Sequence, residues 1–217
     1  YGDMYADIEK FAFFSKAVLS ALPLIDFRPD IIHCHDWQTG LVPVYLDNFR
    51  YGNEFYRGIK TVMTIHNLKF QGTWDPKRVR DITGLPQYYF APDKLEAYKD
   101  GNFLKGGIVF ADAVTTVSNT YADEIKTPFY GEGLDGLLRA RSNSLRGIVN
   151  GIDYNDFNPE TDINLSARYN ATTFRKEKVK NKIQLQKDLG LEQDPKAMMI
   201  GIVSRLTDQK GFDLIAY

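Results

Sequence analysis

Residues 30–40 read DIIHCHDWQTG, and this stretch carries the clearest prediction of the fold class. Its first six residues are rich in β-branched side chains and predict a short strand. Asp36 follows the strand and is placed to cap a helix, on which Trp37, Leu41 and Tyr45 share one side. A strand that leads directly into a helix is typical of a βαβ unit.

The same alternation continues on both sides of this stretch. A helix is predicted from Ile8 to Leu22, with Pro23 ending it, and residues 75–110 are interpreted as helical with breaks at glycines. Strands that alternate with helices predict an α/β fold with a Rossmann-like, doubly wound parallel sheet. The further strands expected are KTVMTIH (60–66), AVTTVS (113–118), RGIVN (146–150) and residues 198–203, the last followed by a helix from Gly211.

The composition shifts along the chain and predicts two domains. Residues 1–155 form the Rossmann-like part, residues 156–173 are a polar crossing segment, and residues 174–217 begin a second Rossmann-like domain with a basic helix. The chain opens at Tyr1 rather than at a methionine. We therefore expect it to be a fragment of a longer protein.

Charge and hydropathy exclude several classes of protein. The 27 basic and 28 acidic residues give a net charge of −1, which argues against a nucleic-acid binder that neutralises phosphates along one face. No run of 18 apolar residues is present, so no membrane span is expected. Cys34 is the single cysteine, which excludes an intrachain disulfide and fits a reducing compartment.

Polar side chains follow the predicted strands at their carboxyl ends. Ligands of open parallel sheets bind outside these ends, so the residues there are candidates for a site. Helix capping accounts for a serine or an asparagine, but it does not account for two histidines and an arginine. The strand-end residues are His35, His66, Asn67, Ser118, Asn150 and Arg205.

A metal site is the alternative for the histidines. His33, His35, Asp36 and His66 could supply zinc ligands. The spacing His-x-His is short, however, and neither a cysteine cluster nor a His-Glu-x-x-His helix supports it. A site for a sugar or another polar ligand is therefore favoured, with no metal, and His33 is interpreted as a structural histidine.

Residues 204–211 read SRLTDQKG and follow an apolar stretch. Arg205 and Lys210 at a helix N-terminus predict an anion site, and a diphosphate suits it because arginine can bind it with two hydrogen bonds. Residues 131–136 read GEGLDG and match the dinucleotide fingerprint by letter. They do not follow a strand, so a turn is predicted there.

Five motifs in this order resemble the bacterial glycogen synthase and plant starch synthase family, over essentially the whole chain. The resemblance implies the GT-B fold and a retaining transfer of glucose from ADP-glucose to the non-reducing end of an α-1,4-glucan. It implies no other cofactor, and a cytoplasmic protein in bacteria or a plastid protein in plants. The motifs are HDWQTGL (35–41), TIHNL (64–68) with QG (71–72), VNGID (149–153), NK (181–182) with LQ (185–186) before LGL (189–191), and SRLTDQKG (204–211).

The resemblance also assigns roles to single residues. His35 resembles the histidine that contacts the donor glucose, and Arg205 and Lys210 resemble the cations on the donor diphosphate; these are the catalytic candidates. The substrate-binding candidates are Asn150 and Asp7, which resemble residues of the sugar pocket, and His66, Asn67 and Gln71, which are expected to line the mouth of the cleft.

Two features of the family have no match in this sequence: its Lys-Thr-Gly-Gly loop and its glutamate motif. We therefore expect the isolated chain to be inactive. Three alternatives remain open at this level: a GT-B retaining transferase that uses UDP-glucose, a non-catalytic glucan-binding relic, and a dinucleotide-dependent oxidoreductase. The oxidoreductase ranks last, because no glycine fingerprint opens the first predicted βα turn.

Overall fold

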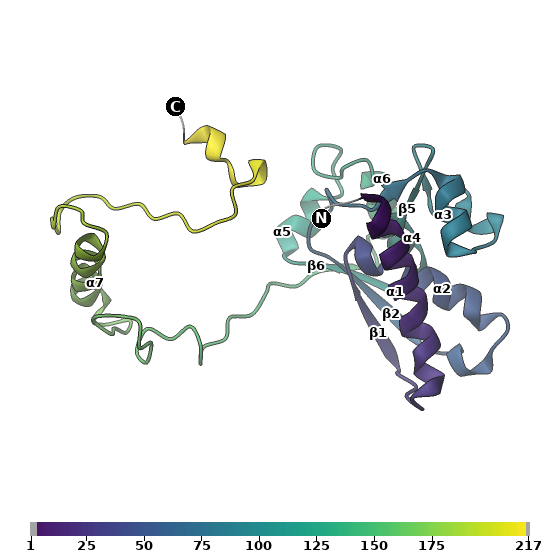
Figure 1. Cartoon of the computed structure of the whole chain (residues 1–217), viewed down its shortest axis with the longest axis horizontal. Coiled ribbons are helices and arrows are strands. Elements are labelled where there is room, and N and C mark those ends of the chain that lie inside the picture. Colours follow the sequence, from purple (N-terminus) through teal and green to yellow (C-terminus); the bar gives the residue numbers. More distant parts are fainter. Residues whose placement is uncertain (1–3, 216–217) are drawn as a thin grey trace. The chain divides into compact units, whose positions relative to one another are not determined.

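The computed structural model describes residues 4–215, and the chain divides into two compact units, residues 1–150 and 151–217. The first unit holds the sheet and the helices that pack on it (Figure 1). The second unit holds one long helix with extended segments on either side. The division after Asn150 lies close to the start of the predicted crossing segment.

A parallel sheet forms the centre of the first unit. In the described part of the chain its four strands have the order β1-β2-β6-β7, and every neighbouring pair is parallel. The four strands predicted in this unit are confirmed, with different ends. The first begins one residue later than predicted, the second and third end one and two residues earlier, and the fourth begins one residue earlier and ends three residues earlier. Their bounds are β1 Ile31–His35, β2 Lys60–Ile65, β6 Ala113–Thr116 and β7 Leu145–Gly147.

The strand register separates an apolar row from a polar row. Cys34 pairs with Met63, Met63 with Val114, and Val114 with Leu145, and none of these side chains is more than 6% exposed. The next residue along each strand points to the opposite face. That second row is polar and contains His35, Thr64, Thr115 and Arg146.

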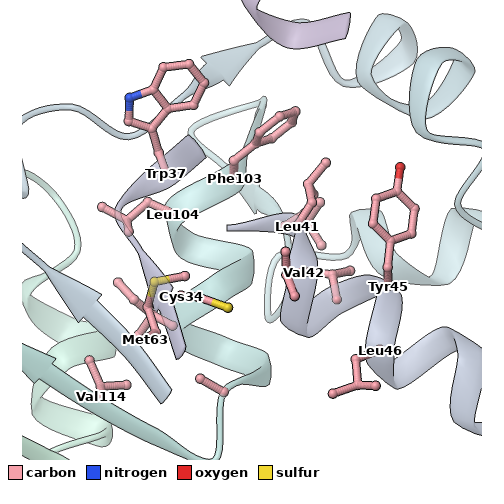
Figure 2. Packing of buried hydrophobic residues seen from close by; sticks show 14 of the residues in the cluster. Cys34, Trp37, Leu41, Val42, Tyr45, Leu46, Met63, Phe103, Leu104 and Val114 are labelled. Atoms are coloured by element: carbon pink, nitrogen blue, oxygen red, sulfur yellow. The ribbon is translucent and has the colours of Figure 1, made fainter. Parts of the chain in front are cut away.

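Helices cover the apolar row. Helix α1 (Met4–Leu24) packs on α2 (Leu41–Arg50), and α2 packs on α4 (Phe103–Phe110) (Figure 1). Pro23 lies inside the last turn of α1, so the helix ends slightly later than predicted. Figure 2 shows Cys34, Met63 and Leu104 on one side of this core and Leu41, Val42 and Tyr45 along α2 on the other. Trp37, Leu41 and Tyr45 are all buried, as their shared side of the helix predicts.

Two glycines allow the backbones to approach closely in this core. A Cβ atom on Gly40 would lie 2.2 Å from the carbonyl oxygen of Phe103, and a Cβ atom on Gly107 would lie 3.1 Å from the Cα atom of Gly40. The turn after β1 therefore rests directly on the backbone of α4, a distance that no larger residue permits.

Residues 75–110 differ from the prediction. Helix α3 (Pro76–Thr83) is present, but β4 (Glu96–Ala97) and β5 (Asp100–Asn102) come after it. They form a short antiparallel sheet, in the order β3-β5-β4, with β3 (Thr73–Trp74), which precedes the helix. Tyr98 and Lys99 form the turn between β4 and β5, with φ angles of 53° and 74°. Strands this short carry no periodicity, and neither turn residue is one that favours positive φ, so the sequence pattern did not reveal them.

The turn predicted at residues 131–136 is confirmed. Glu132 and Gly133 have φ angles of 47° and 78°, and helix α6 (Asp135–Ala140) begins after them. Helix α5 (Asn119–Glu124) follows β6, and the Ser118 side chain caps it by accepting a hydrogen bond from the Tyr121 backbone N–H.

The second unit is organised around helix α7 (Phe174–Asp188), which confirms the predicted basic helix. Asn181 exchanges two hydrogen bonds with the backbone of Ala167, at 2.8 and 2.7 Å. Gln186 exchanges two with the backbone of Asp194, at 3.0 and 3.1 Å. Polar side chains of α7 therefore hold the segments on both of its flanks.

The strand predicted at residues 198–203 is wrong. These residues are extended but unpaired, and Val203 is fully exposed. A strand needs a neighbouring strand for its backbone hydrogen bonds, and the described residues of the second unit contain no other strand. The helix expected from Gly211 is only a 3₁₀ turn, Phe212–Leu214.

The contact at Gly40 predicts that Gly40→Ala destabilises the first unit by about 1–3 kcal/mol, because a methyl group would have to displace the backbone of α4. Both tryptophans of the chain, Trp37 and Trp74, lie in this unit, so urea unfolding followed by tryptophan fluorescence measures its free energy of unfolding. Gly52→Ala is the control, because a Cβ atom there meets nothing within 4 Å. Equal effects of the two substitutions would contradict the close contact.

Candidate functional site

The three histidines of the chain lie close to one another near the carboxyl ends of β1 and β2. His35 is the last residue of β1, and His66 directly follows β2. Their Nδ1 and Nε2 atoms are 3.0 Å apart, which is a hydrogen bond. The ring of His33 lies beside that of His35, with centroids 4.2 Å apart. The structure thus brings together His35 and His66, two residues that the sequence assigned to the site.

The turn after β1 holds the backbone of His35 in place. The Thr39 hydroxyl accepts a hydrogen bond from the His35 N–H at 2.6 Å and donates one to the His35 carbonyl at 2.8 Å. Trp37 anchors the same turn, since its ring contacts Phe11 of α1 and Trp74 of β3 with centroid distances of 4.9 and 5.3 Å. Thr39 lies in the HDWQTGL motif but was not among the predicted site residues.

His33 lies within β1 rather than at the carboxyl end of the strand. Its Nε2 atom lies 2.6 Å from the Thr64 hydroxyl, which lies 2.6 Å from the Thr115 hydroxyl. This chain of hydrogen bonds runs across β1, β2 and β6 on the polar face. It agrees with the interpretation of His33 as a structural histidine.

Asp36 does not cap the helix that follows it, so that prediction is wrong. Its Oδ1 atom accepts hydrogen bonds from the backbone N–H groups of His66, at 2.7 Å, and Asn67, at 3.5 Å. Its backbone has φ 56° and ψ −173°, close to a region that only glycine occupies readily. Such a conformation costs about 1–3 kcal/mol, so the surrounding contacts must hold it.

The environment of His35 favours its neutral form. Burial lowers the pKa of His35 below 6.5, the positive charges that His33 and His66 can carry lower it further, and the Asp36 carboxylate opposes them. The hydrogen bond to His66 agrees with this, because two protonated rings could only present donors to each other. At neutral pH, His35 is therefore an uncharged hydrogen-bonding group.

Gln71 is fixed by both ends of its amide. Its Oε1 atom accepts a hydrogen bond from Asn102 at 2.6 Å, and its Nε2 atom donates one to the Glu132 carbonyl at 2.9 Å. The backbone N–H of Leu104 also donates to the Gln71 carbonyl at 3.0 Å. Gln71 thus joins the start of α4 to the turn at Glu132, and its contact with a substrate stays a prediction.

Asn67 directly follows His66 in the chain, and Asp7 lies on α1. Asn67 is half-buried, and its Oδ1 atom accepts a hydrogen bond from the Lys69 N–H at 3.1 Å. Asp7 lies in the first turn of α1, and its side chain is 13% exposed. It precedes Phe11 by one helical turn, so both share the side of α1 that meets Trp37.

The other predicted site residues lie further along the chain. Asn150 is exposed at the last residue of the first unit. Arg205 and Lys210 belong to the second unit, where both are exposed. Two backbone hydrogen bonds, from Thr207 to Arg205 and from Lys210 to Thr207, fold their segment into consecutive turns. Their binding of a diphosphate stays a prediction.

Between residues 4 and 215, no group of three or more His, Cys, Asp or Glu side chains is arranged to hold a metal ion. Within the same residues, no helix has the length and apolar character that a membrane crossing requires.

Comparison with known proteins agrees with these observations. Residues 1–140 match the family described as starch synthase catalytic domain. A glycogen synthase from Lachnospira eligens is 70% identical over 217 residues, which cover 100% of this chain and 45% of that protein. A glycogen synthase from Clostridioides difficile is 52% identical over 218 residues, covering 100% and 44%.

A solved structure extends the comparison to the fold. The catalytic domain of starch synthase IV from Arabidopsis thaliana, bound to ADP and acarbose, is similar with a TM-score of 0.83 and 36% sequence identity, covering 100% of this chain and 44% of that one. The chain spans about 45% of the length of the curated relatives it matches. The resemblance inferred from the motifs is confirmed: the chain belongs to the family of starch and glycogen synthase catalytic domains, and its parallel-sheet α/β fold is part of the GT-B fold of that family.

Proposed function

We propose that this chain is part of a retaining glucosyltransferase. The enzyme transfers glucose from ADP-glucose to the non-reducing end of an α-1,4-glucan such as glycogen. The observation that carries the proposal is the pair of His35 and His66 at the carboxyl ends of β1 and β2, in a chain that is 70% identical to a glycogen synthase. The presence of ADP in the related plant structure supports an adenine nucleotide as the carrier of the glucose.

The proposed roles follow the charges of the residues. Glucose gains positive charge at C1 as the bond to the leaving group breaks, so neutral partners such as His35 and Asn150 orient it without repelling that charge. ADP gains negative charge as it leaves. Arg205 and Lys210 stabilise this charge more strongly in the transition state than in the ground state, which is the condition for catalysis.

Retention of configuration is assigned to attack on the front face of the sugar. The bond between C1 and the phosphate oxygen breaks, and C1 bonds to the acceptor O4 on the same face. The acceptor hydroxyl passes its proton to the departing phosphate oxygen, so all atoms and charges balance. The reaction includes no further cofactor and no metal. We assign the enzyme to the bacterial cytoplasm, in line with its bacterial relatives.

A chimeric enzyme tests this proposal. This chain replaces the matching segment of the Lachnospira eligens glycogen synthase, and glucan elongation is assayed with ADP-glucose and with UDP-glucose. We expect elongation from ADP-glucose. Elongation from UDP-glucose alone would assign the chain to another GT-B transferase. Glucan binding without elongation from either donor would indicate a non-catalytic relic. The isolated chain is expected to be inactive.

Lys210→Ala in the chimera is expected to lower kcat/KM for ADP-glucose by about 100- to 1,000-fold, the usual cost of removing one group that stabilises developing charge. Lys176→Ala is the matched control, because Lys176 is equally exposed but lies in the first turn of α7. A loss of less than tenfold at Lys210, or an equal loss in the control, would contradict the assigned diphosphate contact.

The lowered pKa of His35 predicts how the first unit responds to pH. The folded chain binds fewer protons at His35 than the unfolded chain between the lowered pKa and 6.5, so its free energy of unfolding falls as the pH drops through this window. An NMR titration of the His35 Cε1–H resonance, assigned with His35→Gln, measures the pKa. His66→Gln is expected to raise it only part of the way, because burial is the larger cause. A midpoint above 6.5 would contradict the prediction.

A further inference from the structure

Asp36 occupies an unusual place in the first unit. It lies between the last residue of β1 and the buried Trp37, and it holds a backbone conformation that a residue with a side chain seldom adopts. Its N–H continues the sheet by donating to the Thr64 carbonyl at 2.9 Å. The strained backbone turns the carboxylate across to the end of β2, where it meets the N–H groups of His66 and Asn67.

The chain after β2 is fixed by side chains at consecutive residues. Asp36 accepts from His66 and Asn67, and the next N–H, that of Leu68, donates to the Tyr121 hydroxyl at 3.1 Å. Asp36 comes from the end of β1 and Tyr121 from α5, on the two sides of β2. These contacts set the position of the His66 backbone, and the His66 side chain itself is exposed.

The position of His66 determines what His35 can do. A neutral imidazole has one donor and one acceptor nitrogen. Nδ1 of His35 and Nε2 of His66 share one hydrogen bond, so only one of these two nitrogens carries the proton, and the role of Nε2 on His35 follows from the tautomer that His66 adopts. A sugar hydroxyl that meets His35 requires one of these two roles.

We propose that Asp36 and His66 are positioning residues for His35. The carboxylate of Asp36 holds the backbone of His66, and the ring of His66 holds His35 in a single tautomer. Neither residue needs to touch the sugar. The catalytic consequence rests on the proposed function, because it requires that His35 contacts the donor glucose.

The first test needs no activity. The nitrogen shifts of the histidine rings are measured by NMR in the 217-residue chain at neutral pH, where Nδ1 and Nε2 of His35 are expected to differ as in one tautomer. Asp36→Gly accepts the backbone conformation without strain but loses the carboxylate, so the two shifts are expected to move toward the average of exchanging tautomers. Asp36→Asn keeps an acceptor oxygen and is expected to preserve the shifts.

Asp112→Ala is the matched control for this experiment. Asp112 holds the opposite end of the sheet, where its Oδ2 atom accepts from the Thr61 N–H at 2.9 Å. Its loss is expected to lower stability without changing the shifts of His35. Unchanged shifts in a folded Asp36→Gly chain would overturn the proposal, as would averaged shifts in Asp112→Ala.

The second test measures glucan elongation by the chimeric synthase. Asp36→Gly and His66→Phe are expected to lower kcat by about 10- to 100-fold, the cost of a misplaced group. The KM for ADP-glucose is expected to change little, and Asp36→Asn to recover most of the kcat. A wild-type kcat in Asp36→Gly would overturn the proposal. An unmodified chimera that does not transfer glucose would refute the proposed function instead, and the NMR shifts would still decide whether Asp36 and His66 position His35.

Discussion

The hydrogen bond from the His66 N–H to the Asp36 carboxylate is the constraint on which the arrangement of the site depends. It joins the ends of β1 and β2 at the point where each strand turns away from the sheet. It also holds Asp36 in its strained conformation, which sends the next residue, Trp37, into the core. Asp36 therefore links the site to the core, because a shift of its backbone would move both the end of β2 and Trp37.

The two faces of the sheet serve different purposes because side chains alternate along each strand. The row from Cys34 to Leu145 is apolar and carries the helices, and burial raises the pKa of the Cys34 thiol to about 12, so this thiol stays protonated and unreactive. The row from His35 to Arg146 is polar, and hydrogen bonds among His33, Thr64 and Thr115 tie it together. The rigid apolar side supports the polar side, where a few tenths of an ångström decide whether a hydrogen bond forms.

The proposed chemistry divides between the two units by charge. The first unit presents His35, whose lowered pKa keeps it neutral, and this suits a sugar that gains positive charge. The second unit presents Arg205 and Lys210, which suit a departing diphosphate. This separation has a physical reason: a cation beside the sugar would oppose the charge that develops at C1, whereas a cation at the phosphate assists the same bond cleavage.

The sequence by itself determined the class of fold and the residue types at the strand ends. β-Branched runs such as those at residues 30–35 and 60–66 specify strands locally, and apolar spacing specifies helices such as α1. Only the tertiary structure decided the features that depend on contact with a distant segment of the chain. Residues 198–203 have the composition of a strand but pair with no other strand among residues 4–215, and β4 and β5 form a sheet although their sequences carry no strand signal. The conformation of Asp36 was also decided by the tertiary structure. Local preference favours a helix cap there, but the free N–H groups at the end of β2, about 30 residues away in the chain, draw the carboxylate across the sheet, and only the folded chain brings these groups within reach.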